Sequence, residues 1–440
     1  MTSARKRPTL ADSMLTTLTG NAYPALIALI TGPIMAHALG VYGRGQVAAA
    51  AAPLSLISTL VTFGIPEAVT FAVAANPRLA RLAARRAGVI LCAAGLLGTG
   101  IIWLAATWLS AGDAETRALI LIASLAVIPT VLVGLLRGVA AAAQQWRMVA
   151  LERGIGATIR LAIILALWGT GTLTPLSATI VLSLMSILGA AVYLRLPRAV
   201  RGRYAPDSPS DAPTARSRGL LSYGGRIWLG SISGILLSRI DQTLMTALSG
   251  SYALGLYAIA VTVSELPLII NSAVRDVTFA TDAASPDDSR LTASARVSFI
   301  ACLAAGVAIG GSMPFWLPWL FGADFVDAVP VAAVLIAAVV LGTPGSIGSA
   351  GLSARGRPGL RSVSLLVAAV VNIILLVALV PGLGAMGAAI ATLLGNLVAA
   401  NLNLVFLKRL AGTRIRDFYL IRAADFRLLA EFAKRKLRRG

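Results

Sequence analysis

Long apolar runs alternate with short polar connections along the whole chain. A helix of about 20 apolar residues crosses the hydrocarbon core of a bilayer. The pattern therefore predicts about twelve membrane-spanning helices. The predicted helices span 14–38, 45–75, 87–111, 117–142, 148–170, 175–196, 220–248, 252–280, 293–319, 327–352, 361–381 and 384–407.

Composition agrees with this pattern. Of the 440 residues, 57% are hydrophobic and only 13% are charged. A soluble chain of this length could not bury so much apolar surface in one or two cores. The two cysteines lie inside apolar runs, which is typical of small buried side chains and not of a disulfide framework. We therefore expect an all-α polytopic membrane protein.

The positive charges are distributed unevenly between the connections. The N-terminus and the even-numbered connections carry 22 of the 38 Lys and Arg residues, and the segment from Lys408 carries 11 more. The odd-numbered connections carry only Arg44 and Arg117. Because basic connections stay inside, both termini are predicted to be cytoplasmic. The net charge of +20 thus orients a membrane protein, and we expect no nucleic-acid partner.

The two halves of the chain are related in sequence. A shift of 210 positions places "MAHALGVYGRGQVAAA" over "MTALSGSYALGLYAIA", with six of sixteen residues identical. Two six-helix lobes inserted with the same orientation would be related by a pseudo-twofold axis along the membrane normal. We predict an N-terminal lobe at 1–196, a flexible cytoplasmic linker at 197–219 and a C-terminal lobe at 220–407. A basic amphipathic cytoplasmic tail at 408–440 completes the chain.

Polar side chains recur inside several of the predicted spans. In the seventh helix, Ser238, Asp241 and Gln242 share one face with other small or polar residues, and Arg239 flanks that face. A charge at the bilayer centre costs about 2.5–3.5 kcal/mol, so it persists only against protein or a wet cavity. The alternative interpretations are structural helix–helix contacts and arginines that reach the interface. Our candidate cavity residues are Arg239, Asp241, Gln242, Ser238, Arg226, Glu265, Asn271, Glu67, Asn21 and Arg160.

Signs of catalysis are missing from the sequence. It contains no G-x-x-x-x-G-K-[ST] motif for nucleotide phosphates. His37 is the only histidine, so a histidine-based metal site or catalytic triad cannot form. We expect a protein that is not an enzyme and that needs no cofactor, with H⁺ or Na⁺ as a possible coupling ion. The 34 arginines against 4 lysines are typical of a bacterial genome rich in G and C, so we expect the bacterial cytoplasmic membrane.

Two long stretches resemble a known family. They are "MAHALGVYGRGQVAAAAAPLSLISTLVTFGIPEAVTFAVA" in the first half and "LLSRIDQTLMTALSGSYALGLYAIAVTVSELPLIINSAV" in the second. Both resemble Wzx-like polysaccharide flippases of the MOP superfamily, whose relatives include MATE exporters and lipid II flippases. The resemblance implies a MATE-like fold around a cationic central cavity. It implies alternating access that moves a lipid-linked, usually pyrophosphate-bearing oligosaccharide to the outer leaflet for cell-surface polysaccharide biosynthesis.

The partners that this resemblance implies are the lipid-linked oligosaccharide, membrane lipids and polysaccharide-assembly enzymes, and we expect a monomer. Three other interpretations stay open. A MATE-type drug or cation antiporter would use a buried carboxylate such as Glu67, Asp241 or Glu265. A lipid II flippase would be expected to carry helices beyond the twelve. A membrane scaffold for envelope assembly would tolerate neutralisation of its buried charges.

Overall fold

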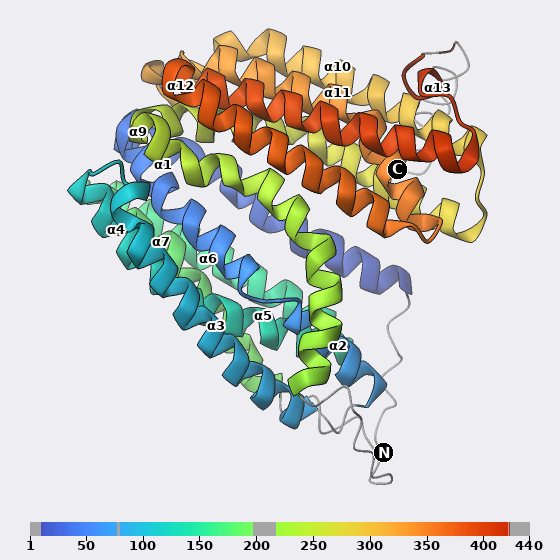
Figure 1. Cartoon of the computed structure of the whole chain (residues 1–440). Coiled ribbons are helices and arrows are strands. Elements are labelled where there is room, and N and C mark those ends of the chain that lie inside the picture. Colours follow the sequence, from blue (N-terminus) through green and yellow to red (C-terminus); the bar gives the residue numbers. More distant parts are fainter. Residues whose placement is uncertain (1–9, 77–79, 197–216, 421, 423–440) are drawn as a thin grey trace. The chain divides into compact units, whose positions relative to one another are not determined.

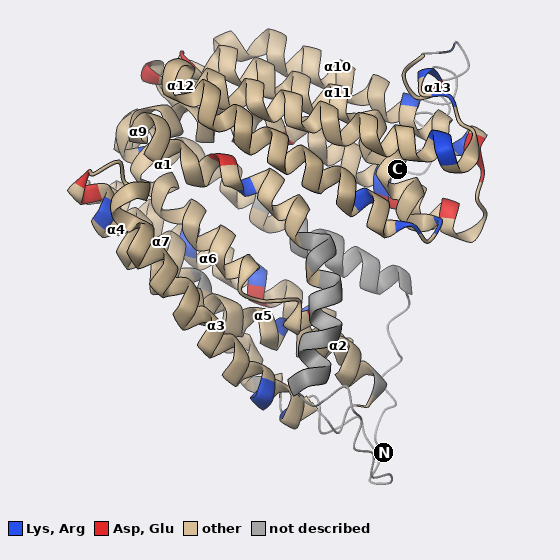
Figure 2. Ribbon diagram, viewed as in Figure 1, with Lys and Arg blue, Asp and Glu red and all other residues tan. Residues whose placement is uncertain are grey.

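The computed structural model describes the chain except for residues 1–9, 77–79, 197–216, 421 and 423–440. Helices make up nearly all of the described part, which contains no β-strand (Figure 1). Long stretches of these helices carry no Lys, Arg, Asp or Glu, and the charged residues gather mainly towards helix ends and connections (Figure 2). This distribution is the one expected of helices that cross a bilayer.

The N-terminal helices follow one another closely along the chain. They are α1 (Leu10–Leu60), α2 (Ile65–Ala75), α3 (Ala80–Leu109), α4 (Ala114–Ser124), α5 (Val127–Ala142), α6 (Trp146–Gly169), α7 (Pro175–Leu184) and the 3₁₀-helix η2 (Met185–Arg195). The C-terminal helices are longer. They are α9 (Ser217–Ala284), α10 (Asp288–Phe321), the 3₁₀-helix η4 (Ala323–Phe325), α11 (Ala328–Ala354), α12 (Pro358–Ala411) and α13 (Arg416–Tyr419).

Three long helices are each divided by one glycine with a positive φ. They are Gly40 in α1 (φ 64°), Gly250 in α9 (φ 82°) and Gly384 in α12 (φ 54°). Gly40 and Gly250 also have nearly the same ψ, −175° and 173°, and the 210-residue shift superposes them. A residue with a Cβ would pay about 1–3 kcal/mol for this conformation. The sequence identity at these positions therefore reflects a backbone requirement in both halves.

The predicted number of spans is confirmed. Eight helices of the described chain are long and apolar enough to cross a membrane. Three of these eight helices are each divided in two, at Gly40, Gly250 and Gly384, which gives eleven membrane-spanning segments. Helix α6, which is 24 residues long, is the twelfth. Every predicted span overlaps one of these segments, and the predicted span 45–75 also includes α2. The arrangement is that of a multi-pass membrane protein.

Some spans contain interruptions that the hydropathy pattern did not predict. Between α1 and α2 the chain makes a turn with positive φ at Phe63 (46°) and Gly64 (64°), and Pro66 lies in the first turn of α2. Proline lacks the N–H that an uninterrupted helix needs, but it fits a helix start. Pro129 occupies a similar place near the start of α5, just after α4 ends. At each interruption a proline therefore lies in the first turn of the helix that follows.

The chain forms two compact units, Met1–Leu229 and Gly230–Gly440, here called the N-terminal and C-terminal units. In the N-terminal unit α1 packs on α4, α6 and α7, and α5 packs on α2 and α3. In the C-terminal unit α11 packs on α10 and α12. Most of the predicted linker, at 197–216, lies outside the described residues.

The contact between α11 and α12 is made by their backbones. A Cβ added at Gly345 would lie 2.1 Å from Cα of Ala400 and 2.6 Å from its carbonyl oxygen. No side chain fits in that space, so glycine is required for the two helices to approach this closely. This contact forms part of the floor of the polar pocket described below, which both residues line.

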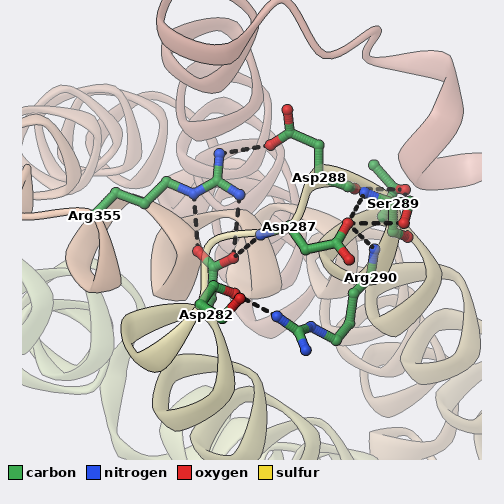
Figure 3. A network of polar contacts seen from close by, with 8 residues as sticks. Asp282, Asp287, Asp288, Ser289, Arg290 and Arg355 are labelled. Atoms are coloured by element: carbon green, nitrogen blue, oxygen red, sulfur yellow. Dashed lines mark hydrogen bonds and ion pairs between the residues drawn. The ribbon is translucent and has the colours of Figure 1, made fainter.

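A charged network joins three helix ends of the C-terminal unit (Figure 3). Arg355, which follows α11, donates from Nε to Oδ2 of Asp282 at 2.8 Å and from Nη2 to Oδ1 at 3.1 Å. Its Nη1 donates to Oδ1 of Asp288 at 2.6 Å. The Asp282 side chain is only 3% exposed, and its hydrogen bonds with Arg355 raise the pKa of this guanidinium. The network thereby ties the ends of α9, α10 and α11 together.

The segment after α12 folds back onto α10. Phe418 in α13 is fully buried and packs with Leu291 and Ala295 of α10. Nη1 of Arg296 donates to the Asp417 carbonyl oxygen at 2.8 Å. The first part of the predicted tail at 408–440 is thus packed against the C-terminal unit, and its remainder at 423–440 lies outside the described residues.

Candidate functional site

A polar pocket of about 320 Å³ lies inside the C-terminal unit, between α9, α11 and α12. Small residues of α11 and α12 make room for the pocket, and polar side chains from all three helices line it. Its polar and charged lining comprises Ser238, Asp241, Gln242, Tyr257, Ser264, Glu265, Asn271, Arg275, Ser346, Ser349, Arg361, Thr392, Asn396 and Asn403. Such a concentration of polar groups in an apolar bundle is typical of a substrate or ion pathway.

Five of the residues singled out from the sequence meet in this pocket: Ser238, Asp241, Gln242, Glu265 and Asn271. The first three come from the half of α9 before Gly250, and the other two come from the half after it. The glycine break allows both halves of α9 to contribute to the same pocket.

Asp241 lies at the centre of a buried hydrogen-bond network. The Tyr257 hydroxyl donates to Oδ2 of Asp241, and the Gln242 backbone N–H donates to Oδ1 at 2.7 Å. The Tyr257 oxygen also lies 3.1 Å from Oγ1 of Thr392 on α12. Asp241 is 4% exposed and Tyr257 is fully buried. A carboxylate held in this way can bind a proton or a small cation through its remaining lone pairs.

A second set of hydrogen bonds fixes the side-chain amides. Nδ2 of Asn271 donates to Oγ of Ser346 on α11 at 3.0 Å, and the Ser298 hydroxyl of α10 donates to Oδ1 of Asn271 at 3.3 Å. Nδ2 of Asn403 donates to the Gly345 carbonyl oxygen at 3.3 Å. Asn271 therefore joins three helices of this unit and also lines the pocket.

Two arginines, Arg275 on α9 and Arg361 on α12, line the same pocket. They lie close enough to repel each other electrostatically. Arg275 pairs with the exposed carboxylate of Asp276 at 3.3 Å, whereas Arg361 makes no hydrogen bond or ion pair within the described part of the chain. Two like charges held together in this way attract an anion.

The sequence did not single out these two arginines as site residues. Arg275 does lie on the same helical stripe as Tyr257, Ser264 and Asn271, and this stripe could have identified it. Arg361 carried no comparable signal, because it meets Arg275 only through the packing of α12 beside α9.

The other predicted residues lie elsewhere. Arg239 is exposed and does not line this pocket, although its charge acts on both Asp241 and Glu265. Arg160 on α6 is partly buried, and its Nε has no hydrogen-bond partner among the described residues. Glu67 lines a separate pocket in the N-terminal unit. The side chains of Asn21 and Arg226 are outside the described part of the structure.

A family model described as "Polysaccharide biosynthesis protein" matches residues 10–279, which is more than half of the chain. The chain belongs to this family. No curated protein sequence matches it. The matched region includes the whole N-terminal unit from α1 onwards and most of α9, hence also Asp241, Glu265, Asn271 and Arg275.

Solved structures of MOP-superfamily proteins share the fold. An inward-facing multidrug resistance MATE family transporter has a TM-score of 0.69 at 16% identity, over 89% of this chain and 97% of that chain. The lipid II flippase MurJ in an inward closed conformation has a TM-score of 0.72 at 13% identity, over 92% and 89%. A MOP superfamily transporter from Pyrococcus furiosus has a TM-score of 0.55 at 16% identity, over 90% and 92%.

These findings establish the fold and its broad class. The polysaccharide biosynthesis family member described here has the MATE-like, all-helical fold of MOP-superfamily flippases and transporters. The chain is a multi-pass membrane protein of the polysaccharide biosynthesis family, with the fold that MATE transporters and MurJ share. The chemistry that follows is derived from its own pocket residues.

Proposed function

We propose that this family member moves a lipid-linked, pyrophosphate-bearing oligosaccharide from the inner to the outer leaflet by alternating access, for cell-surface polysaccharide biosynthesis. The observation that carries the proposal is the arginine pair, Arg275 and Arg361, at a pocket whose other polar lining consists of amides, hydroxyls and the carboxylates of Asp241 and Glu265. A phosphate group in hydrocarbon must exchange its water for other donors, and the planar guanidinium fork matches phosphate geometry.

Different residues of the pocket would contact different parts of such a substrate. Arg275 and Arg361 supply charge for the pyrophosphate, and the amides and hydroxyls around them supply donors and acceptors for polar groups next to it. Arg239, Arg226 and Arg160 are further candidates for phosphate contacts at other stages of transport. The substrate is the cargo of the protein, so no covalent chemistry and no cofactor are required.

Deletion of the gene in its own host tests this function. We expect loss of surface polysaccharide together with accumulation of the lipid-linked oligosaccharide on the inner leaflet, where membrane-impermeant periodate does not reach it. Plasmid-borne wild-type protein should restore both. Normal export with no accumulated intermediate would refute the proposal. Cell lysis with arrested peptidoglycan synthesis would indicate a lipid II flippase, and sensitivity to cationic dyes alone would indicate a drug antiporter.

Asp241 is our candidate for ion coupling, with H⁺ or Na⁺ as the coupled cation. Its carboxylate is buried, faces the pocket and is hydrogen-bonded by Tyr257. Asp241→Asn removes the charge and keeps the shape, so we expect about tenfold slower export in energised membranes, the size of a typical loss of about 1.4 kcal/mol. Export driven by imposed proton or sodium gradients measures this.

The matched control for that measurement is Asp324→Asn, which removes an exposed carboxylate from η4 that does not line the pocket. We expect it to export at the wild-type rate. An Asp241→Asn protein that still responds fully to the imposed gradients would exclude Asp241 as the coupling group.

The charge distribution supports a location and topology for the protein. We propose that it resides in the bacterial cytoplasmic membrane as a monomer, with both termini and the arginine-rich connections in the cytoplasm. Polysaccharide-assembly enzymes are the protein partners that this function implies. Accessibility labelling of single cysteines placed in the connections measures the orientation.

A further inference from the structure

The N-terminal unit contains a pocket of its own, of about 500 Å³, which the proposed function does not yet use. It lies between α1, α2, α5 and α6 of that unit. Its chemically distinctive lining residues are Glu67, Thr70, Thr130, Arg137, Trp146 and Arg153. A pocket of this volume is within the range of small-molecule sites. Trp146 is the first residue of α6, next to a connection that the charge distribution predicts to be cytoplasmic.

Arg137 is held in place by a buried carboxylate behind the pocket. Its Nε and Nη2 donate to the two carboxylate oxygens of Glu152, at 3.1 and 2.9 Å. The Tyr193 hydroxyl donates to the same carboxylate at 3.3 Å. Glu152 is 4% exposed and Tyr193 is 3% exposed. The guanidinium has five N–H donors, so three remain for other partners on a side chain whose rotamer is already fixed.

The wall formed by α2 and α5 is rigid. Oγ1 of Thr70 donates to the Pro66 carbonyl oxygen at 2.8 Å and to the Gly138 carbonyl oxygen at 3.0 Å. A Cβ at Gly138 would lie only 2.7 Å from the Pro66 oxygen. The helix that carries Glu67 and the helix that carries Arg137 are therefore locked against each other, and the pocket is present before any ligand arrives.

We propose that this pocket binds a sugar ring of the transported molecule, an inference that rests on the proposed function. The half-buried indole of Trp146 offers an apolar plane for the C–H face of a pyranose. Arg137 offers N–H donors, and the exposed carboxylate of Glu67 offers acceptors on the helix opposite. Sugar hydroxyls donate and accept, so they match a lining that presents both kinds of group.

The charge of the pocket favours a sugar over a phosphate. The positive charge of Arg137 is matched by the carboxylate of Glu152, and the lining adds one further charge of each sign, Arg153 and Glu67. A phosphate would therefore find little net attraction and would approach the Glu67 carboxylate. The C-terminal pocket differs because its Arg361 makes no ion pair within the described part of the chain, so we assign the phosphate to that pocket and the saccharide to this one.

Saturation-transfer NMR on the purified full chain tests the inference. The probe is the delipidated oligosaccharide that mild acid releases from the host's own lipid-linked pool. We expect saturation of ring protons by wild-type protein, about tenfold less by Trp146→Ala, and partial retention by Trp146→Phe, which keeps an aromatic plane. Glu67→Gln should also weaken the signal. Trp168→Ala, which removes a half-exposed indole from the other end of α6, is the matched control and should bind normally.

Several outcomes would overturn the inference. Equal saturation by wild-type and Trp146→Ala protein would mean that no sugar stacks there, and full competition by inorganic phosphate would indicate an anion site. If Trp146→Ala misfolds, as judged by size-exclusion chromatography, Trp146→Phe and Glu67→Gln carry the test. These results are independent of the deletion experiment. If the Trp146 and Glu67 variants bind the oligosaccharide normally and the deletion strain accumulates the lipid-linked oligosaccharide, only the sugar site is refuted. If wild-type protein binds the oligosaccharide in a Trp146-dependent way but the deletion strain accumulates no lipid-linked oligosaccharide, the proposed function is refuted.

Discussion

Replacement of both Arg275 and Arg361 by glutamate should reduce polysaccharide export by about 100-fold or more, while the protein still reaches the membrane. Each guanidinium attracts a nearby phosphate by about 4 kcal/mol at contact distance near a protein surface, and each carboxylate would repel it by a similar amount. A loss of about 2.7 kcal/mol already corresponds to 100-fold. Surface polysaccharide per cell and the inner-leaflet pool of lipid-linked oligosaccharide measure the effect.

Conservative variants make this experiment specific. The double lysine variant keeps both charges but loses the planar fork, so it should retain part of the export. Arg117→Glu reverses an exposed charge in the N-terminal unit, away from either pocket, and should export normally. Wild-type export by the double glutamate variant, at wild-type protein level, would exclude these arginines from substrate binding.

Arg355→Ala should destabilise the protein by about 3–5 kcal/mol, because removal of one partner leaves a buried charge uncompensated. The Asp282 carboxylate is 3% exposed and receives two of its hydrogen bonds from Arg355. Of its donors among the described residues, the Asp287 backbone N–H at 3.1 Å alone would remain. Denaturant or thermal unfolding of the purified protein in detergent measures the loss.

A second substitution separates charge from packing. Asp282→Asn added to Arg355→Ala removes the stranded charge, so the double variant should be more stable than Arg355→Ala alone. Arg290→Ala removes a neighbouring but exposed arginine, and it should cost no more than about 1 kcal/mol. Equal stability of Arg355→Ala and wild-type protein would mean that the network contributes nothing to folding.

The spans could be predicted from sequence because a bilayer imposes them residue by residue: each crossing needs about 20 apolar positions. The interruptions were harder. Gly40 and Gly250 were visible only as identities between the halves, and nothing in the hydropathy pattern distinguishes them from a glycine inside a helix. The turn before α2 depends on Gly64 and Pro66 in an otherwise apolar run, which hydropathy alone does not resolve.

The pocket was only partly accessible to sequence reasoning. Residues on one face of one helix, such as Ser238, Asp241 and Gln242, share a period that sequence reveals. Arg361 and Arg355 were counted only as charges that orient the chain. The residues they meet, Arg275 for Arg361 and Asp282 for Arg355, lie 86 and 73 residues away in sequence. In the N-terminal pocket Glu67 was recognised, whereas Arg137 and Trp146 join it only through packing of α5 and α6.

The backbone contact at Gly345 and Ala400 limits how the C-terminal unit can deform. Two helices that touch with no side chains between them cannot slide past each other without a steric clash. We therefore expect α11 and the second half of α12 to move as one rigid body. Bending within this unit is then left to its glycine breaks, Gly250 in α9 and Gly384 in α12. Transport would flex the protein at these two hinges while the pocket floor keeps its shape.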